Sequence, residues 1–426
     1  MLDLRFILDN LETVVENTRQ RKVTVNFDTL KELAAQRSSL IQEVEELRRR
    51  QNEIAALLGG KMESAQRQAL VTEGKELKPK AAALEADLRQ VENDLHEDLG
   101  KVPNLTHPDA PIGDGDKDNR ELRRVGQIPQ FSFAPKDHVV LGEELDLIDF
   151  NGGSKVAGQN FYFLRGDAVL LDFALCQYAL RILIEDGFVP YITPDVARPE
   201  ILEGIGYMPR GEETQIYSLA GQDLCLIATA EITLGGLYSD TIIPQSRLPA
   251  KLAGVSHCFR TEAGAYGRAS RGLYRVHQFN KVEMFVYCTP DDSDRQLEHM
   301  VALEEKIFSG LGIPYRVVDC CTGDLGGPAY RKFDLEAWMP GRGNGGEWGE
   351  VTSASNCTDY QARRLNIRYR PEGGGKPRLV HTLNGTAVAT SRAIIALLEN
   401  YQQEDGSVVI PEPLRSYMGK PCIRAA

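Results

Sequence analysis

The sequence lacks the signals of a membrane protein or of a secreted, disulfide-bonded protein. No apolar run is long enough to cross a bilayer, and the first residues lack the basic and apolar segments of a secretory signal. The eight cysteines include no Cys-x-x-Cys pair, so we expect reduced thiols in the core and no zinc site. These absences predict a cytoplasmic protein that has no membrane partner.

Common catalytic signatures are missing as well. There is no Gly-x-x-x-x-Gly-Lys-Ser/Thr sequence and hence no P-loop, no Gly-x-Gly-x-x-Gly after a predicted strand, and no His-Glu-x-x-His. The net charge of −12 argues against broad affinity for nucleic acid. Any contact with nucleic acid must therefore depend on a local basic patch.

A coiled-coil pattern occupies the first quarter of the chain, which at 426 residues is long enough for two domains. Between residues 28 and 99 the apolar positions step mostly by three, four or seven, as along an a/d seam. They are Leu33, Leu40, Val44, Leu47, Ile54 and Leu58, then Leu70, Gly74, Leu77, Ala81, Leu84, Leu88, Val91 and Leu95. A break at 58–61 predicts an antiparallel helical hairpin. A linker rich in Pro, Gly and Asp follows, so we predict domains at residues 1–105 and 106–426.

Cations gather at one level of this predicted hairpin. They are Arg48, Arg49 and Arg50 on the first helix and Lys75, Lys78 and Lys80 on the second. Most charge runs are solvated helical faces, and such a cluster can also grip a phosphate backbone. Taken by itself the run favours the solvated face.

A strand–loop–strand pattern carries most of the chemistry. Phe259–Glu262 leads into a glycine-rich loop that includes 263–268, and Arg275–Glu283 reads as the returning strand. Alternation would send Arg275, His277, Phe279, Lys281 and Glu283 to one face. A guanidinium binds phosphate, a phenyl ring stacks on a base, and a carboxylate takes a hydroxyl or an ammonium. The pattern predicts a site for a nucleotide beside a small amino acid.

Three further segments add candidate groups. Glu350 and Ser353, in the segment 347–357, offer the hard oxygens that Mg²⁺ prefers together with substrate phosphates. The Thr-Ala-Glu run of 229–231 could by itself be a helix cap. The segment 384–392 opens an amphipathic helix with Arg392.

Together these segments resemble the class II aminoacyl-tRNA synthetases. The run FRTEAGAYGRASRGLYRVHQFNKVEMF looks like motif 2 of the seryl-tRNA synthetase family, and 384–392 resembles motif 3. A helix over 167–186 with a strand over 188–193, ending at Pro194, resembles motif 1, the dimer interface of that class. The resemblance implies an α+β fold: an antiparallel coiled-coil arm, then a catalytic domain built on an antiparallel β-sheet flanked by helices.

The activity implied by the resemblance is a serine–tRNA ligase: serine and ATP give seryl-adenylate, and the seryl group is then transferred to the 3′ end of serine tRNA. Family members also charge selenocysteine tRNA where it exists. The implied catalytic residues are Arg260, Glu350 and Arg392. The implied serine-binding residues are Thr229, Ala230, Glu231, Glu283 and Thr386. The implied ATP-binding residues are Arg260, Thr261, Glu262, Arg275, Val276, Phe279, Glu350, Val351, Thr352, Ser353 and Arg392. Glu350 and Ser353 would bind Mg²⁺, and the six cations of the hairpin would bind tRNA. The implied assembly is a homodimer.

The chain departs from the family pattern in a few places. Ala228 stands where the family usually has proline, Val351 and Thr352 replace Ile-Ser, and Ser391 precedes the motif 3 arginine. Two rival functions remain: a ligase that loads an amino acid onto a carrier protein, and a non-catalytic paralogue that binds tRNA. The arm argues against the first rival, and the retained charged residues argue against the second.

Overall fold

The computed structural model describes residues 1–207, 215–262 and 272–425. The chain divides into two compact units, Met1–Pro103 and Asn104–Ala426. The predicted loop over 263–268 lies outside the described residues. No helix in the described ranges is both long enough and apolar enough to cross a membrane.

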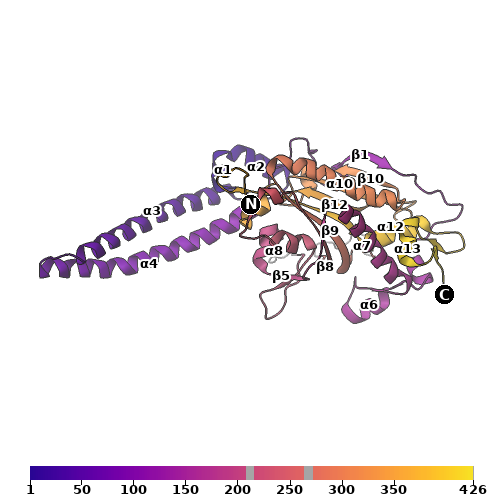
Figure 1. Ribbon diagram of the computed structural model, residues 1–426, viewed down its shortest axis with the longest axis horizontal. Coiled ribbons are helices and arrows are strands. Elements are labelled where there is room, and N and C mark those ends of the chain that lie inside the picture. Colours follow the sequence, from indigo (N-terminus) through magenta and orange to yellow (C-terminus); the bar gives the residue numbers. More distant parts are fainter. Residues whose placement is uncertain (208–214, 263–271, 426) are drawn as a thin grey trace. The chain divides into compact units, whose positions relative to one another are not determined.

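The first unit is entirely helical. It contains α1 (Leu4–Asp9), α2 (Leu11–Gln20), α3 (Phe27–Leu58) and α4 (Ser64–Lys101). The Asn26 side chain caps α3 by accepting hydrogen bonds from the backbone N–H groups of Asp28 and Thr29. Helices α3 and α4 run side by side as a hairpin (Figure 1). At 1.5 Å per residue, the 32 residues of α3 reach about 48 Å.

The heptad seam holds this helical hairpin together. Val44 and Ile54 on α3, and Val91 and Leu95 on α4, are almost completely buried. Every other position of the predicted seam is buried or half-buried, and none is exposed. The predicted coiled-coil hairpin is therefore confirmed, and burial of this one stripe is what stabilises two helices that otherwise face water.

The second unit is an α+β domain built on one large sheet. Its strands, in spatial order, are β1 (Arg120–Val125), β10 (Tyr315–Asp319), β11 (Arg331–Met339), β12 (Glu347–Asn356), β15 (His381–Ala389), β9 (Gln278–Cys288), β8 (Ala250–Phe259) and β4 (Val189–Ile192). All neighbouring strands are antiparallel except β4 and β8. This sheet confirms the predicted α+β class.

Helices and short strands surround the sheet. The helices are α5 (His138–Glu144), α6 (Phe150–Ala157), α7 (Asp167–Glu185), α8 (Pro199–Ile205), α9 (Ala230–Gly236), α10 (Ser293–Gly310), α11 (Tyr360–Arg364), α12 (Thr390–Tyr401) and α13 (Glu412–Met418). The short strands are β2 (Ile148–Asp149), β3 (Phe163–Leu164), β5 (Val196–Ala197), β6 (Cys225–Leu226), β7 (Ile242–Pro244), β13 (Arg368–Arg370), β14 (Arg378–Leu379), β16 (Val408–Val409) and β17 (Cys422–Ile423).

Alternation along β9 divides the core into two layers. Met284 and Val286 join the cluster formed with α7, α10 and α12, whereas Phe285 and Tyr287 join the cluster formed with α8 and α9. Because side chains two residues apart share a face, Phe279, Lys281 and Glu283 lie on the same face as Phe285. That face carries the candidate site.

One predicted boundary is wrong. The returning strand begins at Gln278, three residues later than the sequence predicts. The His277 ring explains the late start, because its Nδ1 lies 2.7 Å from the backbone oxygen of Arg260 and 3.0 Å from the Tyr217 hydroxyl. Strict alternation therefore does not reach back to Arg275. The helix and strand predicted at 167–186 and 188–193 are confirmed as α7 and β4.

Candidate active site

A cavity opens on this face of the sheet. It is lined by Arg260, Glu262, Tyr274, Val276, Phe279, Lys281, Glu350, Val351, Thr352, Thr386, Ala389, Ser391 and Arg392. Nine of these residues are candidate site residues from the sequence; Tyr274, Lys281, Ala389 and Ser391 are not. The cavity thus brings together residues from three parts of the chain. They are the run that resembles motif 2, the segment 347–357 that carries the predicted Mg²⁺ ligands, and the segment 384–392 that resembles motif 3.

A β-bulge places Glu350 and Ser353 on one face of β12. Residues three apart on a regular strand point to opposite faces. Here Glu350 pairs with Glu336 and Ser353 with Asp334, while Val351 is the extra residue at the register shift. Since Asp334 and Glu336 are two apart on β11, their partners Glu350 and Ser353 share a face. The spacing of these two oxygen donors is therefore compatible with a single cation.

The Arg392 guanidinium pairs with Glu350 inside the cavity. Its Nη1 lies 2.9 Å from the Glu350 carboxylate and donates to the Glu350 backbone oxygen at 3.1 Å. Burial alone would raise the pKa of Glu350, but the positive charges of Arg392, Lys332 and Arg260 outweigh it and hold that pKa below its usual range. Glu350 is therefore ionised at neutral pH.

Aromatic rings and guanidinium groups alternate around the cavity. Arg260 lies over the Phe279 ring at 5.3 Å, and Arg392 lies over the Tyr274 ring at 4.7 Å. Arg342 approaches the same tyrosine at 4.2 Å. Sequence analysis did not single out Tyr274, although an aromatic residue directly before Arg275 in the glycine-rich run was a usable signal.

Glu262 and Arg275 form an ion pair at the rim. Arg275 Nη1 lies 3.2 Å from the Glu262 carboxylate. Glu262 itself has φ of +51°, a left-handed conformation that is uncommon for a residue other than glycine. Such a conformation persists only where the surroundings hold it, and it is often found at functional sites. Thr261 lies beside it and outside the cavity lining.

The Thr-Ala-Glu segment lies behind the cavity wall. Thr229 caps α9, its hydroxyl accepting from the backbone N–H of Glu231 at 3.2 Å, and Ala230 is the first helical residue. Arg260 Nε donates to the Ala228 backbone oxygen at 3.4 Å, which ties this segment to the end of β8. Thr229, Ala230 and Glu231 are nonetheless absent from the cavity lining itself.

Two amide side chains orient the Glu231 carboxylate. Gln361 and Asn384 both donate to Glu231 Oε1, at 2.8 and 2.9 Å. The Thr382 hydroxyl donates to Gln361 Oε1 at 2.7 Å and so fixes which way that amide points. In the described ranges no hydrogen bond reaches Glu231 Oε2. Sequence analysis missed Gln361 and Asn384; Asn384 is two residues from Thr386 on β15, and that spacing was a usable signal.

A second carboxylate lies close to Glu231. Glu283 is 2% exposed and contacts the Lys281 ammonium, and Thr386 faces it across the β9–β15 ladder. Burial, and then the charge of Glu283, raise the pKa of Glu231 to about 7, although Gln361, Lys281 and Arg260 act in the opposite direction. Two buried acids and one lysine thus form a compact polar cluster behind Arg260.

The family resemblance implies that Glu231 binds the ammonium group of serine, and on that expectation the KM for serine should depend on pH. A carboxyl with a pKa of about 7 becomes mostly ionised between pH 6 and pH 8, so its attraction for an ammonium group should strengthen over that range. The KM for serine should fall about tenfold from pH 6 to pH 8, with the KM for ATP nearly constant. Pyrophosphate exchange across this range measures both constants. Glu231→Gln should remove the serine dependence, and its persistence in that variant would contradict this origin.

A further polar group lies on β11 and the turn before it. Cys320, Asp324 and Asp334 each bring a possible metal-ligand atom within 4.8 Å of the others. The Lys332 ammonium lies 3.3 Å from Asp324 and 3.2 Å from Asp334. Lys332 therefore supplies a positive charge to this group. Sequence analysis did not bring these residues together.

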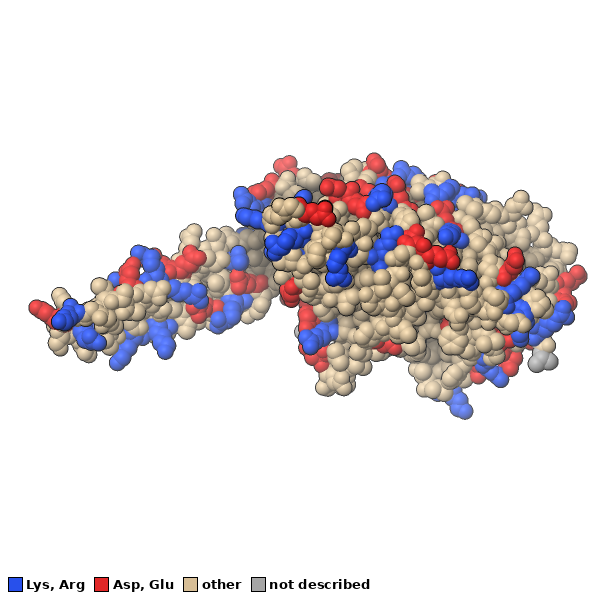
Figure 2. Space-filling model, in the orientation of Figure 1, with Lys and Arg blue, Asp and Glu red and all other residues tan. Residues whose placement is uncertain are grey.

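The cations of the helical hairpin are interleaved with acids. Arg48 pairs with Glu85 at 2.8 Å and Arg50 with Glu73 at 2.7 Å, each across the two helices. Arg49 pairs within α3 with Glu46 and Glu53, whereas Lys75, Lys78 and Lys80 on α4 are exposed. Figure 2 shows basic and acidic side chains mixed along this hairpin.

Family models match both units of the chain. Residues 216–401 match the family "tRNA synthetase class II core domain (G, H, P, S and T)", and residues 1–106 match "Seryl-tRNA synthetase N-terminal domain". The fold is that of a class II aminoacyl-tRNA synthetase. The serine–tRNA ligase of Treponema denticola is 58% identical over 98% of this chain and 99% of its own length.

Two further relatives agree. The serine–tRNA ligase of Rubrobacter xylanophilus is 57% identical over the full length of both chains. The crystal structure of seryl-tRNA synthetase from Pyrococcus horikoshii, complexed with ATP, superposes with a TM-score of 0.89 at 39% identity and covers both chains fully. This chain belongs to the seryl-tRNA synthetase family and is a serine–tRNA ligase.

Proposed function

We propose that the cavity binds ATP through its arginines and its aromatic rings. The observation that carries this proposal is the convergence of Arg260 and Arg392 on one cavity that is also lined by Phe279 and Glu350. Arg260 holds the α-phosphate, where negative charge develops during adenylate formation. Arg275 and Arg392 hold the outer phosphates. Phe279 and Arg392 flank adenine, and Glu262 lies near its amino group.

Arg392 exchanges one anion for another when ATP binds. In the structure its partner is the Glu350 carboxylate, at 2.9 Å. Glu350 and Ser353 share a face of β12 because of the bulge at Val351, and their carboxylate and hydroxyl oxygens suit Mg²⁺. When bound, the cation would neutralise phosphate charge, and these two side chains would hold it. Arg392 is then free to donate to phosphate.

The serine substrate is bound by the polar cluster of Glu231, Glu283 and Lys281. Glu231 Oε2 takes the ammonium group of serine, supported by Thr229, Ala230 and the amides of Gln361 and Asn384. Glu283 and Thr386 take the hydroxyl. We assign no residue as a general base, so catalysis rests on positioning and electrostatics.

Pyrophosphate exchange with each of the standard amino acids tests this assignment. We expect exchange with serine far above that with any other amino acid, followed by transfer to purified serine tRNA. Transfer to a carrier protein in place of tRNA would support the first rival function. Absence of exchange with every amino acid, in a protein that binds tRNA, would support the second.

The helical hairpin serves tRNA binding in this proposal. The support is its place in a separate compact unit, together with the cations Arg48, Arg49, Arg50, Lys75, Lys78 and Lys80 at one level of the hairpin. Recognition by such a hairpin depends mainly on shape and phosphate contact. Serine tRNA is the proposed substrate, and selenocysteine tRNA is a second one where it exists. The proposed location is the cytoplasm, where tRNA is charged.

Deleting residues 28–99 should separate the two half-reactions. We expect serine activation to stay near its normal rate, because the cavity lies wholly in the second unit. The efficiency of tRNA charging should fall by about 10³-fold or more, since several phosphate contacts are lost together. Pyrophosphate exchange and tRNA aminoacylation on one preparation measure both. Wild-type charging by the truncated protein would leave the hairpin without a role in tRNA binding.

We also propose a homodimer through α7 and β4. Phe173 on α7 is 56% exposed and Ile192 on β4 is 91% exposed, and β4 is an edge strand of the sheet. Exposed apolar side chains on an edge strand favour association with another chain. Ile192→Asp should therefore shift the protein toward monomers in sedimentation equilibrium. A monomeric wild-type protein at micromolar concentration would refute the proposal.

A further inference from the structure

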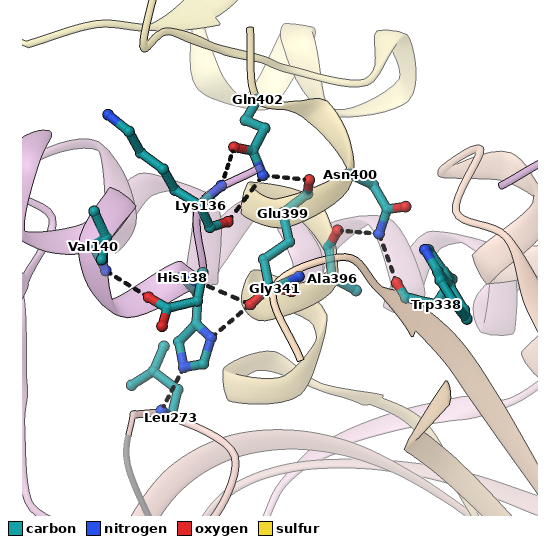
Figure 3. Close-up of polar contacts among 11 residues, drawn as sticks. Lys136, His138, Val140, Leu273, Trp338, Gly341, Ala396, Glu399, Asn400 and Gln402 are labelled. Carbon is teal, nitrogen blue, oxygen red and sulfur yellow. Dashed lines mark hydrogen bonds and ion pairs between the residues drawn. The ribbon is translucent and has the colours of Figure 1, made fainter. Parts of the chain in front are cut away.

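Four segments that are distant in the sequence meet at the buried carboxylate of Glu399. Glu399 lies on α12, the helix that begins beside Arg392. Figure 3 shows His138 at the start of α5, Gly341 after β11, and Leu273 before β9 gathered around it. Glu399, His138 and Gly341 lie outside the motifs that the family resemblance singles out, and Leu273, inside the motif 2 run, is not a predicted site residue.

The carboxylate of Glu399 is fully engaged. Its Oε1 accepts the backbone N–H of His138 at 3.0 Å and lies 2.8 Å from His138 Nδ1, and its Oε2 accepts the backbone N–H of Gly341 at 2.8 Å. Glu399 is 1% exposed. A buried carboxylate is costly unless it is fully hydrogen-bonded, so these three donors hold α5, α12 and the Gly341 turn in one arrangement.

The hydrogen bonds fix the proton on the His138 ring. The backbone N–H of Leu273 donates to His138 Nε2 at 3.1 Å, so this nitrogen must carry a lone pair. The proton of the neutral ring is then on Nδ1, from which it is donated to Glu399. The imidazole therefore links the Glu399 carboxylate to the backbone of Leu273 through one hydrogen bond at each ring nitrogen.

Two glycines allow the close approach of these segments. A Cβ on Gly272, which has φ of +87°, would collide with the His138 ring. A Cβ on Gly341 would collide with the backbone of Asp137. Only glycine fits at both places. The segments that contain Gly272 and Gly341 are therefore tightly packed against the segment that contains Asp137 and His138.

Leu273 is joined directly to Tyr274, a wall of the ATP cavity. The Tyr274 ring lies under Arg392 at 4.7 Å and near Arg342 at 4.2 Å, and its hydroxyl donates to the Glu350 backbone oxygen at 3.4 Å. Arg392 is itself on α12, seven residues before Glu399. Helix α12 thus carries both Arg392, which contacts Tyr274, and Glu399, which is linked through His138 to Leu273.

We propose that Glu399 and His138 form a positioning relay that sets Tyr274 against Arg392, and thereby orders the ATP side of the active site. This relay goes beyond the ligase activity and touches no substrate. Its function is to hold the residues that lead into β9 at a fixed position relative to α12. Disturbing it should therefore weaken ATP binding more than serine binding.

Two substitutions at His138 separate the ends of the relay. In His138→Gln the amide oxygen can take the place of Nε2 and accept from Leu273. In His138→Asn the shorter amide can donate to Glu399 but cannot reach Leu273. We expect His138→Asn to raise the KM for ATP in pyrophosphate exchange by about tenfold. The KM for serine should change less than twofold. His138→Gln should recover only part of the loss, because it keeps an acceptor for Leu273 but loses the side-chain donor to Glu399.

Matched controls come from the C-terminal end of α12 and the residue that follows it. Asn400 donates to the Trp338 backbone oxygen at 2.7 Å, and Gln402 binds both backbone groups of Lys136. Both residues anchor α12 to the same surroundings without reaching Leu273 (Figure 3). Asn400→Ala and Gln402→Ala should lower the melting temperature and leave the KM for ATP nearly unchanged. An equal rise in the KM for ATP in these variants would overturn the relay and leave only a packing role.

Hydrogen exchange in the wild-type protein and in a Glu399 variant tests the relay if the His138 variants fail to fold. Hydrogen exchange at the Leu273 amide should be slow, because the imidazole holds that N–H in a buried site. It should become fast in Glu399→Gln, whose amide can no longer orient the ring as an anion does. Fast exchange in the wild type, or unchanged slow exchange in Glu399→Gln, would overturn the proposal.

Discussion

Replacing Arg260 with alanine is expected to lower the rate of serine-dependent pyrophosphate exchange by about 10²–10³-fold. Arg260 lines the ATP cavity, lies over Phe279 at 5.3 Å and is anchored by its Nε to the Ala228 backbone oxygen. The guanidinium is therefore held in place before ATP arrives, and in the proposed site it would stabilise charge on the α-phosphate without reorganising. Neutral side chains offer no substitute for that charge.

Arg260→Lys is the matched variant for this test. It keeps the positive charge but loses the planar fork and the contact with Ala228. We therefore expect its exchange rate to lie between the rates of wild type and Arg260→Ala. Arg124→Ala serves as the control, because Arg124 lies over the Trp348 ring at 5.6 Å and does not line the ATP cavity. The melting temperature of all variants should stay close to that of wild type. Near-normal exchange by Arg260→Ala would remove Arg260 from the catalytic residues.

The elements with strong periodicity could be predicted from the sequence. The helical hairpin follows from a seam in which Val44, Ile54, Val91 and Leu95 recur at heptad spacing, because burial of that stripe is the only way for two isolated helices to hide apolar surface. Helix α12 and the pair α7–β4 follow from equally regular patterns. In these segments local pattern and tertiary packing favour the same structure.

The site could be predicted only where its residues are close in sequence. Phe279 and Arg260 belong to one hairpin, and simple alternation places Phe279 on the correct face. The bulge at Val351 is different, because a period of two would have separated Glu350 from Ser353. The family resemblance supplied that pairing, and the irregular register supplies its physical reason.

Contacts between distant segments could not be predicted from the sequence at all. Gln361 reaches Glu231 across 130 residues, and His138 reaches Glu399 across 261. Each is an ordinary polar residue within its own segment, with no periodicity to mark it. The fold alone brings these residues together, and their polar atoms are satisfied only there.

Glu283→Ala is expected to abolish most serine activation and most of the preference for serine over alanine. Glu283 is buried beside Lys281 and faces Thr386 across the sheet. A site built to bind a substrate hydroxyl rejects the analogue without it by about 10⁴-fold or more, since its own polar groups are then left unpaired. Threonine retains the hydroxyl and must be excluded by its extra methyl group, which discriminates more weakly.

The control for this prediction is a carboxyl on the neighbouring helix. Glu304 on α10 is buried and accepts from the Thr352 hydroxyl at 2.8 Å, and burial raises the pKa of Glu304 well above its usual range. Because its hydrogen bond is to Thr352 and not to a proposed serine-binding residue, Glu304→Gln should leave serine selectivity unchanged. Glu283→Gln keeps an acceptor and should retain part of the selectivity that alanine loses. Pyrophosphate exchange with serine, alanine and threonine measures all three variants, and unchanged serine-over-alanine discrimination in Glu283→Ala would show that Glu283 does not bind the hydroxyl.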